Sequence, residues 1–374
     1  MEKKKILILL PVFDLGGAEK QGFYAAKSLN NTSQYSSEIW ALNKSSGNLI
    51  PLIESEGIPY KNLEISFEEL NSTKSRLLVY FRMIRLLRKS NFYAIIPFTF
   101  HSNLMANFCY KLAGIKKSVW FQISLDLHIK IGRLERLVRF AKPIYASNSY
   151  YAGEQIKIRH KLPENQKVHF VPNPFELKKP QLNRSDFRKQ IGVSDSDFLF
   201  TIVANFYFEK DHLTLLKAVK LLKSKGVQFK LLLAGDNKLD SPYLNNLKSY
   251  ILDEELYDVV KFLGVVKDVP GLLKSIDCAM LTSSSEGSPN ALIEYAAYAV
   301  PVIVSDIQPN LEIVGQNYDF QFPVGEEKVL EERMGKMITN NAEVKELMID
   351  KSQEILQKFS VIENLNAFTS ILKN

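Results

Sequence analysis

Two carboxylates and the loop between them form the segment of this 374-residue chain whose residue types most clearly suggest chemistry. Glu286 and Glu294 stand eight residues apart. The apolar run 278–281 before them predicts a buried strand. Pro289 suits the first turn of a helix, because the backbone nitrogen there has no intrahelical acceptor. The segment therefore predicts a strand, a loop that carries Glu286, and a helix that begins near Asn290 and carries Glu294.

A helix N-terminus at the end of a strand is a binding site for phosphate. The first N–H groups of the helix have no intrahelical acceptor, and the helix dipole adds positive potential there. Carboxylates accept hydrogen bonds from hydroxyl groups, so Glu286 and Glu294 suit the hydroxyls of a sugar or a ribose. We therefore expect a ligand that combines a diphosphate with sugar hydroxyls.

Short apolar runs alternate with helical patterns along the chain, which is typical of parallel sheets with helices on both faces. Such sheets bind ligands at the carboxyl ends of their strands. Two prolines, Pro172 and Pro174, interrupt regular structure and predict a boundary between domains 1–172 and 173–357. The expected strands are 5–10, 36–42, 93–97, 118–123, 143–147, 198–203, 229–234, 259–262, 278–281 and 301–304, and the expected helices include 20–29, 74–89, 214–225 and 290–298.

The net charge of +7 is unevenly distributed along the chain. Residues 1–180 carry +13 and the remainder −6, so the first half is expected to face an anionic partner, either nucleic acid or an anionic membrane. The two cysteines have no metal-binding or redox spacing, which favours a reduced, cytoplasmic protein. The basic residues 3–5 precede an apolar run too short for a secretion signal, and the chain has no apolar stretch of about 18 residues that could span a membrane.

The ordered set of motifs resembles the retaining glycosyltransferases of the GT-B fold, family 4 or the group 1 class. The pair Glu286-x7-Glu294, with Gly287 and Pro289 inside it, resembles the signature of that family. The flanking segments that share the resemblance are 15–19 (LGGAE), 203–212 (VANFYFEKDH), 231–236 (LLLAGD), 262–264 (FLG), 299–303 (AVPVI) and 310–314 (NLEIV).

The resemblance implies two Rossmann-like, doubly wound parallel-sheet domains that face a central cleft. Residues 1–172 would form an acceptor domain, joined by a final helix 358–374 that crosses back to it, and residues 173–357 would bind the nucleotide sugar. The implied activity is metal-independent, retaining transfer of a hexosyl group from a nucleotide-diphosphate sugar, such as a UDP-sugar, to a glycan or lipid-linked acceptor. Bacterial surface polysaccharide synthesis is the implied setting, and no cofactor is expected.

The resemblance also assigns roles to single residues. Glu286 would contact the donor sugar, Glu294 the ribose hydroxyls, and Lys210 the leaving phosphate. Asn205 stands where many members carry an arginine, five residues before the lysine. The expected catalytic residues are Glu286, Lys210 and His101, and the expected donor-binding residues are Gly16, Gly17, Asn205, Lys210, Glu286, Gly287, Ser288, Pro289, Asn290, Ala291, Leu292 and Glu294.

The expected catalytic histidine is less well defined. Family members often carry a histidine at the end of a strand in the first domain, where this chain has Gln122 and Ser124. His101 and His128 are nearby candidates, of which we assign His101.

Two alternatives to the transferase stay open at this point. The chain could be another GT-B enzyme, such as a nucleotide-sugar epimerase, or a sugar-nucleotide-binding protein with impaired catalysis. Asp195-Ser196-Asp197 resembles a metal-binding D-x-D motif, but its place in a polar linker favours a turn, and no metal site is expected.

Two basic helices bear on the partners of the chain. Helix 130–142 and helix 74–89 are either solvated or in peripheral contact with anionic lipid. Nucleic acid is not expected, because these segments lack interleaved aromatic residues on a known binding fold. In helix 74–89 we expect one apolar stripe of Leu77, Phe81, Ile84 and Leu87, with arginines elsewhere.

Overall fold

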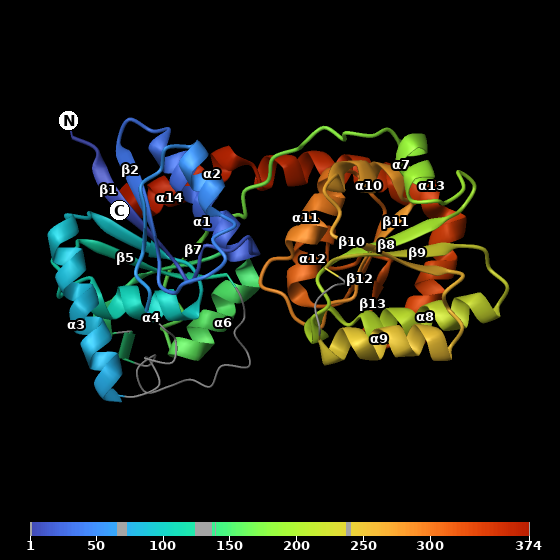
Figure 1. Cartoon of the computed structure of the whole chain (residues 1–374), viewed down its shortest axis with the longest axis horizontal. Helices are drawn as coiled ribbons and strands as arrows, with labels where there is room; N and C mark the ends of the chain where they lie inside the picture. Colours follow the sequence, from blue (N-terminus) through green and yellow to red (C-terminus); the bar gives the residue numbers. More distant parts are fainter. Residues whose placement is uncertain (1, 66–72, 124–136, 139, 237–240, 374) are drawn as a thin grey trace. The chain divides into compact units, whose positions relative to one another are not determined.

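The computed structural model describes residues 2–65, 73–123, 137–138, 140–236 and 241–373 (Figure 1). The chain divides into two compact units, each built on its own sheet. Unit 1 consists of Met1–Pro174 with Phe359–Asn374, and unit 2 consists of Phe175–Lys358. Every strand pair in both sheets is parallel. The predicted fold class, two Rossmann-like α/β units with parallel sheets, is thus confirmed.

Unit 1 contains a seven-stranded sheet in the order β3-β2-β1-β4-β5-β6-β7. The order reverses next to β1, which makes the sheet doubly wound. Its strands are β1 (Lys4–Leu10), β2 (Tyr35–Ala41), β3 (Tyr60–Asn62), β4 (Ala94–Pro97), β5 (Lys117–Gln122), β6 (Ile144–Ser147) and β7 (Val168–Phe170). Its helices are α1 (Gly17–Asn30), α2 (Ile50–Ser55), α3 (Thr73–Ser90), α4 (Phe100–Cys109), α6 (Tyr150–His160) and α14 (Val361–Lys373).

Strand β1 shows why this sheet forms at the centre of the unit. Its alternate side chains enter two different apolar clusters, Ile6 and Ile8 on one face and Leu7 and Leu9 on the other. A strand buried on both faces reads as a continuous apolar run, because neither face meets water. The first cluster also contains residues of α1 and α14, and the second contains residues of α3 and α4.

Unit 2 contains a six-stranded sheet in the order β10-β9-β8-β11-β12-β13. Here the order reverses at β8, so the sheet is doubly wound as well. Its strands are β8 (Leu199–Val203), β9 (Lys230–Ala234), β10 (Val260–Gly264), β11 (Cys278–Leu281), β12 (Val302–Ser305) and β13 (Gln321–Phe322). Its helices are α7 (Arg184–Gln190), α8 (His212–Ser224), α9 (Pro242–Asp253), α10 (Val269–Ser275), α11 (Asn290–Ala297), α12 (Gln308–Val314) and α13 (Glu327–Lys358), with a short 3₁₀ helix η2 (Phe208–Lys210) after β8.

All ten expected strands are present, within one or two residues of their predicted bounds. The strands that the sequence did not predict are β3, β7 and β13. Each is only two or three residues long and lies at the edge of its sheet. Such short edge strands show no usable hydrophobic periodicity, which is the signal that the prediction required.

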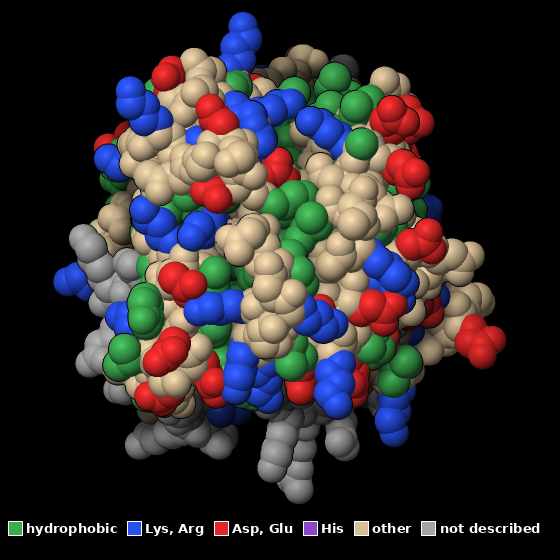
Figure 2. Space-filling model, turned by 90° about the vertical axis from the view of Figure 1, so that its right-hand side faces the viewer, with side chains coloured by type: hydrophobic (Ala, Val, Ile, Leu, Met, Phe, Trp, Pro, Cys, Tyr) green, Lys and Arg blue, Asp and Glu red, His purple; other side chains and the backbone are tan. Residues whose placement is uncertain are grey.

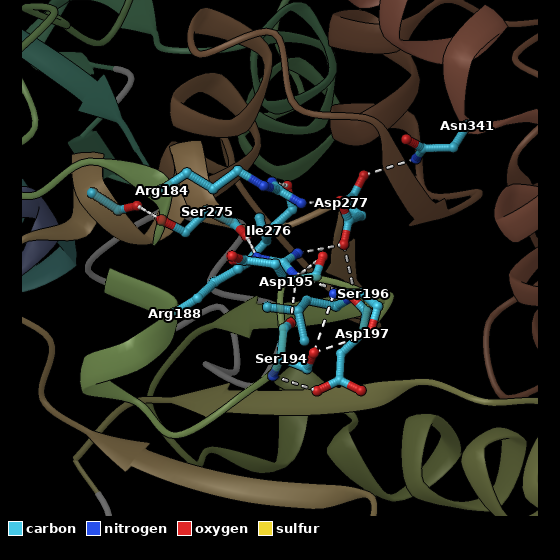
Figure 3. Close-up of polar contacts among 12 residues, drawn as sticks. Arg184, Arg188, Ser194, Asp195, Ser196, Asp197, Ser275, Ile276, Asp277 and Asn341 are labelled. Atoms are coloured by element: carbon cyan, nitrogen blue, oxygen red, sulfur yellow. Dashed lines mark hydrogen bonds and ion pairs between the residues drawn. The ribbon is translucent and has the colours of Figure 1, made fainter. Parts of the chain in front are cut away.

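A buried arginine organises the beginning of unit 2 (Figure 3). Arg188 is fully buried, and its guanidinium forms an ion pair with Asp277 at 2.8 Å. The turn predicted at 195–197 is confirmed, because the Asp197 nitrogen donates to the Ser194 oxygen at 3.2 Å. The guanidinium also donates to four backbone carbonyls, those of Ser194, Asp195, Asp197 and Ser275. The D-x-D segment therefore presents its carbonyls to an internal arginine.

The apolar stripe predicted for α3 is not the face of the helix that is buried against the sheet. Among the residues of α3 whose side chains are described, Val79, Met83 and Leu87 are buried. Leu77 and Phe81, which were expected on one stripe with Ile84 and Leu87, are 64% and 77% exposed, so most of that stripe is not the face that packs on the sheet. The 3.6-residue period fits either face, and only the packing of the sheet selects between them.

Candidate functional site

The segment from Glu286 to Glu294 lies at the carboxyl edge of the unit 2 sheet. Strand β11 ends at Leu281, and α11 begins at Asn290, as predicted. Pro289 is the N-cap residue and provides no side-chain cap. The N-terminus of α11 therefore lies directly after the carboxyl end of β11, where the helix dipole places positive potential.

An ion pair joins this segment to the loop after β8. The Lys210 Nζ lies 2.5 Å from the Glu286 Oε1, with the two side chains 26% and 13% exposed. The Ser283 hydroxyl donates to the same carboxylate oxygen at 2.7 Å. The fold thus brings together two of the expected catalytic residues, which are 76 positions apart in the sequence.

Backbone contacts fix the two loops against each other. The Thr282 hydroxyl donates to the Lys210 carbonyl at 2.8 Å, and the Ser284 nitrogen donates to the Glu209 carbonyl at 2.8 Å. These contacts hold the backbones on both sides of the ion pair. The ion pair therefore belongs to a defined loop structure rather than to two mobile surface chains.

The other expected donor-site residues of α11 have different exposures. Leu292 is fully buried, so only its backbone is available to a ligand. Gly287 and Pro289 are buried, Ser288, Ala291 and Glu294 are partly buried, and Asn290 is exposed.

A tyrosine that the sequence did not single out joins α11 to the sheet. The hydroxyl of the fully buried Tyr295 accepts a hydrogen bond from the Val203 nitrogen at 2.8 Å, which ties α11 to the end of β8. Burial raises the pKa of Tyr295, so the phenol stays protonated. Because Val203 ends β8, the contact sets the position of α11 at the carboxyl edge of the sheet.

The loops after β8 and β9 meet beside this site at a glycine. A Cβ added to Gly235 would lie 2.1 Å from the Ala204 carbonyl oxygen, so no side chain fits at this position. The Asn205 Oδ1 accepts a hydrogen bond from the Asp236 nitrogen at 3.4 Å. Asn205, the residue in the place of the family's arginine, therefore contacts the loop after β9.

A buried histidine, His212, lies two residues after Lys210 in the sequence. His212 is fully buried at the first position of α8, with its ring next to Phe206 and Tyr243. Neither ring nitrogen has a hydrogen-bond partner in the described part of the chain. Burial, with a smaller contribution from Lys210, lowers the pKa of His212 to about 3. The sequence contained this residue in the motif 203–212 but did not indicate its burial.

In unit 1, the expected glycine loop lies against the carboxylate of Glu19. Gly16 is the N-cap residue of α1. Its φ of −89° is accessible to any residue, so the backbone conformation does not require a glycine here. A Cβ at Gly16 would lie 2.1 Å from the Glu19 Oε2, so the absence of a side chain makes room for Glu19. Burial and then the nearby Asp14 raise the pKa of Glu19. Gly17 is the first residue of α1.

His101 lies at the beginning of α4, at the carboxyl edge of the unit 1 sheet. Its side chain is exposed. The helix is fixed to β5 by Asn103, whose side chain donates to the Phe121 carbonyl and accepts from the Phe121 nitrogen, both at 2.8 Å. Thr99, two residues before His101, adopts a φ of +75°, an unfavourable value for a branched residue.

Gln122 and Ser124 stand where family members often carry the histidine, and His128 lies nearby in the sequence. Gln122 is buried and accepts a hydrogen bond from the Trp120 indole at 3.0 Å. Ser124, His128 and most of helix 130–142 lie outside the described residues.

The described residues contain neither a cluster of metal ligands nor a membrane-spanning helix. No group of three or more histidine, cysteine, aspartate or glutamate side chains there could hold a metal ion. Within the same residues, no helix combines the length and apolarity that crossing a bilayer requires. Figure 2 shows one face of the chain, on which acidic and basic side chains are interspersed rather than sorted by sign.

Comparison with known proteins agrees with this geometry. The family model described as glycosyl transferases group 1 matches residues 183–354, nearly all of unit 2. Unit 2 is therefore similar to the glycosyl transferases of group 1 over residues 183–354. The segment with Lys210, Glu286 and α11 lies within the matched region.

Curated relatives match over part of the chain. EpsF of Bacillus subtilis is 32% identical over 146 residues, which cover 38% of this chain and 37% of that protein. The UDP-Gal:alpha-D-GlcNAc-diphosphoundecaprenol alpha-1,3-galactosyltransferase of Escherichia coli is 30% identical over 172 residues, which cover 44% of this chain and 43% of that protein. The chain therefore spans well under two thirds of the length of these relatives.

Solved structures match over the whole chain. HepE of Anabaena in complex with UDP has a TM-score of 0.83 at 19% identity, covering 99% of both chains. The lipopolysaccharide outer core galactosyltransferase WaaB has a TM-score of 0.74 at 19% identity and the same coverage. At these identities the likeness shows the fold, which is GT-B.

Proposed function

We propose that the chain is a retaining glycosyltransferase that moves a sugar from a nucleotide-diphosphate sugar to a glycan or lipid-linked acceptor. The observation that carries this proposal is the Lys210–Glu286 pair beside the N-terminus of α11. It combines a cation, a carboxylate and a helix dipole at the edge where parallel sheets bind ligands.

The chemistry of transfer matches these groups. The bond between the anomeric carbon and the diphosphate oxygen breaks, and the acceptor hydroxyl forms the new bond on the same face of the sugar. The acceptor's proton goes to the leaving diphosphate, so the step requires no side-chain nucleophile. Lys210 and the first N–H groups of α11 stabilise the negative charge that develops on the diphosphate. They supply the positive charge that a metal ion provides in other transferases, and the proposed reaction is therefore metal-independent.

The remaining residues of the proposed donor site bind rather than react. Glu286 would contact the donor sugar, and Glu294 would accept hydrogen bonds from the ribose hydroxyls. Asn205 and the backbone of 287–292 would lie along the diphosphate. In unit 1, Gly16 and Gly17 are further proposed donor-binding residues, and His101 is the proposed catalytic histidine.

The relatives support a particular substrate class. The matched relative from E. coli is a UDP-Gal:alpha-D-GlcNAc-diphosphoundecaprenol alpha-1,3-galactosyltransferase, and another, from Streptococcus pneumoniae, is an alpha-monoglucosyldiacylglycerol synthase. HepE was solved with UDP-glucose. We therefore propose a UDP-sugar donor, a lipid-linked or growing glycan acceptor, and a role in bacterial surface polysaccharide synthesis in the cytoplasm.

The test combines a donor panel with one substitution. The protein is incubated with UDP- and GDP-sugars and a polyprenyl-diphosphate-linked sugar acceptor, and the products are analysed by mass spectrometry. We expect transfer with retained anomeric configuration, and its loss in Glu286→Ala with an unchanged melting temperature. Epimerised donor would instead indicate an epimerase, and tight donor binding without turnover would indicate a binding protein. Full activity of Glu286→Ala would refute the assigned site.

The exposed face of α3 supports a peripheral membrane contact at the inner face of the cell membrane. Leu77, Leu78 and Phe81 are exposed on this helix, and Arg82 and Arg85 are exposed beside them. Apolar side chains next to arginines suit the boundary between lipid headgroups and acyl chains. In Figure 1, α3 lies on the outer side of unit 1.

Liposome flotation tests this contact. Each arginine near an anionic surface contributes about 1 kcal/mol, so the double variant Arg82→Ala/Arg85→Ala should bind anionic vesicles about thirtyfold more weakly. Lys345→Ala, which removes an exposed cation from α13 of unit 2, serves as the control and should bind normally. Equal binding of the double variant and the wild type would exclude this face as the contact.

A further inference from the structure

The two oxygens of the Glu286 carboxylate have different environments. Oε1 accepts hydrogen bonds from the Lys210 ammonium at 2.5 Å and from the Ser283 hydroxyl at 2.7 Å. Oε2 receives no hydrogen bond from any residue that the structure describes. One oxygen is therefore anchored, and the other remains available to a substrate hydroxyl.

The anchor at Ser283 continues into the protein interior. The Ser305 hydroxyl, at the end of β12, donates to the Ser283 carbonyl at 2.5 Å. The Asn310 amide, on α12, donates to the Ser305 carbonyl at 2.9 Å and to the Ser305 hydroxyl at 3.0 Å. All three residues are fully buried. They connect the carboxylate to two elements, β12 and α12, that do not carry it.

The donors in this chain all point in one direction. The Asn310 amide donates to the Ser305 hydroxyl, which donates to the Ser283 backbone, and the Ser283 hydroxyl donates to the Glu286 carboxylate. The Ser283 backbone carbonyl accepts from Ser305, whereas its hydroxyl donates to Glu286, so the buried bonds fix the residue that holds the carboxylate. Hydrogen bonds that end on a charged acceptor are among the strongest. The arrangement therefore holds the Glu286 carboxylate in one orientation.

We propose that Ser283, supported by Ser305 and Asn310, is the positioning residue that presents the Glu286 Oε2 to the donor sugar. This inference rests on the proposed function of Glu286 and extends it to residues outside the Glu286–Glu294 segment. The need for a second anchor follows from the chemistry of Lys210. Its ammonium must turn some of its three N–H donors toward the diphosphate, and during that change Ser283 keeps the carboxylate in place.

The sequence around these residues contains the matched control. Ser284 is the neighbour of Ser283, but its hydroxyl is exposed and donates to the Glu209 carbonyl at 3.3 Å. Ser283→Ala and Ser284→Ala remove the same atom from adjacent positions of one loop. Only the first removal affects the carboxylate.

The experiment measures kcat, donor KM, affinity for UDP by calorimetry and melting temperature for the wild type and the variants. Losing a hydrogen bond to a charged group corresponds to about a tenfold to hundredfold change in a rate constant. We expect Ser283→Ala to lower kcat by about this factor, with UDP affinity within about twofold of wild type. Ser283→Thr, which retains the hydroxyl, should recover most of the activity, and Ser284→Ala should behave as wild type. Ser305→Ala should lower kcat in the same direction by a smaller factor.

The outcomes separate this inference from the proposal on which it rests. A wild-type kcat in Ser283→Ala would overturn the positioning role and leave the proposed function intact. A parallel loss of kcat, UDP affinity and melting temperature, with no recovery in Ser283→Thr, would show a merely structural serine and would also overturn it. If the wild type transfers no sugar from any donor, the proposed function fails, and the inference fails with it.

Discussion

The buried imidazole of His212 makes a sharp prediction about stability and pH. An unfolded histidine has a pKa of 6.5, whereas burial lowers that of the folded His212 to about 3. Between these two values the unfolded chain binds a proton that the folded chain does not. The free energy of unfolding should therefore fall as the pH falls below 6.5, and this loss should continue until the folded pKa is reached.

The magnitude follows from the two pKa values. Near neutral pH both states are largely unprotonated, and near pH 5 only the unfolded state is protonated, so the linkage removes about 2 kcal/mol of stability over that interval. His212→Leu removes the titrating group. It also removes two ring nitrogens without hydrogen-bond partners among the described residues, so its stability near neutral pH should lie within about 1 kcal/mol of wild type.

The assay is urea unfolding of wild type and His212→Leu at several pH values, followed by a signal from unit 2. Subtracting the two curves cancels every other titrating group that both proteins share. The variant should gain about 2 kcal/mol on the wild type as the pH is lowered from neutral to about 5. A difference that does not change with pH would refute the reasoning, as would a protonated His212 detected by NMR in the folded protein near pH 6.

Three further predictions concern unit 2. Glu294→Ala should weaken UDP binding by about tenfold, with a smaller effect on kcat, because one carboxylate contact to the ribose is lost; unchanged affinity in calorimetry would remove Glu294 from the donor site. Arg188→Met should destabilise the unit by about 3–5 kcal/mol, since Asp277 loses its buried partner and keeps only the ion pair with Arg184, and four backbone carbonyls lose their donor. A midpoint of urea unfolding equal to wild type would contradict this. Gly235→Ala should lower the melting temperature, because the new Cβ would lie 2.1 Å from the Ala204 carbonyl oxygen. The comparison is with wild type alone, since Gly57 has a φ of +61° and is not a comparable control. An unchanged melting temperature would show that the loop moves freely.

Much of the fold was predictable because the strands are buried on both faces. A run such as residues 6–10 is continuous in hydrophobicity, and that property depends on neighbouring residues alone. The helix start at Asn290 was predictable for a similar reason, since Pro289 and the polar loop act locally. By contrast, the two-residue strand β13 forms only because β12 provides its hydrogen-bonding partner.

The candidate site was predictable as a set of residues but not as a set of contacts. The motif order identified Lys210 and Glu286, yet nothing in the sequence paired the ammonium with one particular carboxylate oxygen. Ser283 looked like one serine in a run of three. Its difference from Ser284 lies in the direction of its side chain, which the loop backbone sets.

The sequence by itself determined the strand and helix pattern, the resemblance to the group 1 glycosyltransferases, and the position of the helix start after β11. These features depend on residues close together in the chain, where spacing and residue type suffice. Only the tertiary structure decided that Lys210 meets Glu286, that His212 is buried without partners among the described residues, and that α3 turns Leu77 and Phe81 to its exposed face. Each of these depends on which surfaces pack together, because burial and hydrogen bonding are set by neighbours in space rather than by neighbours in the chain.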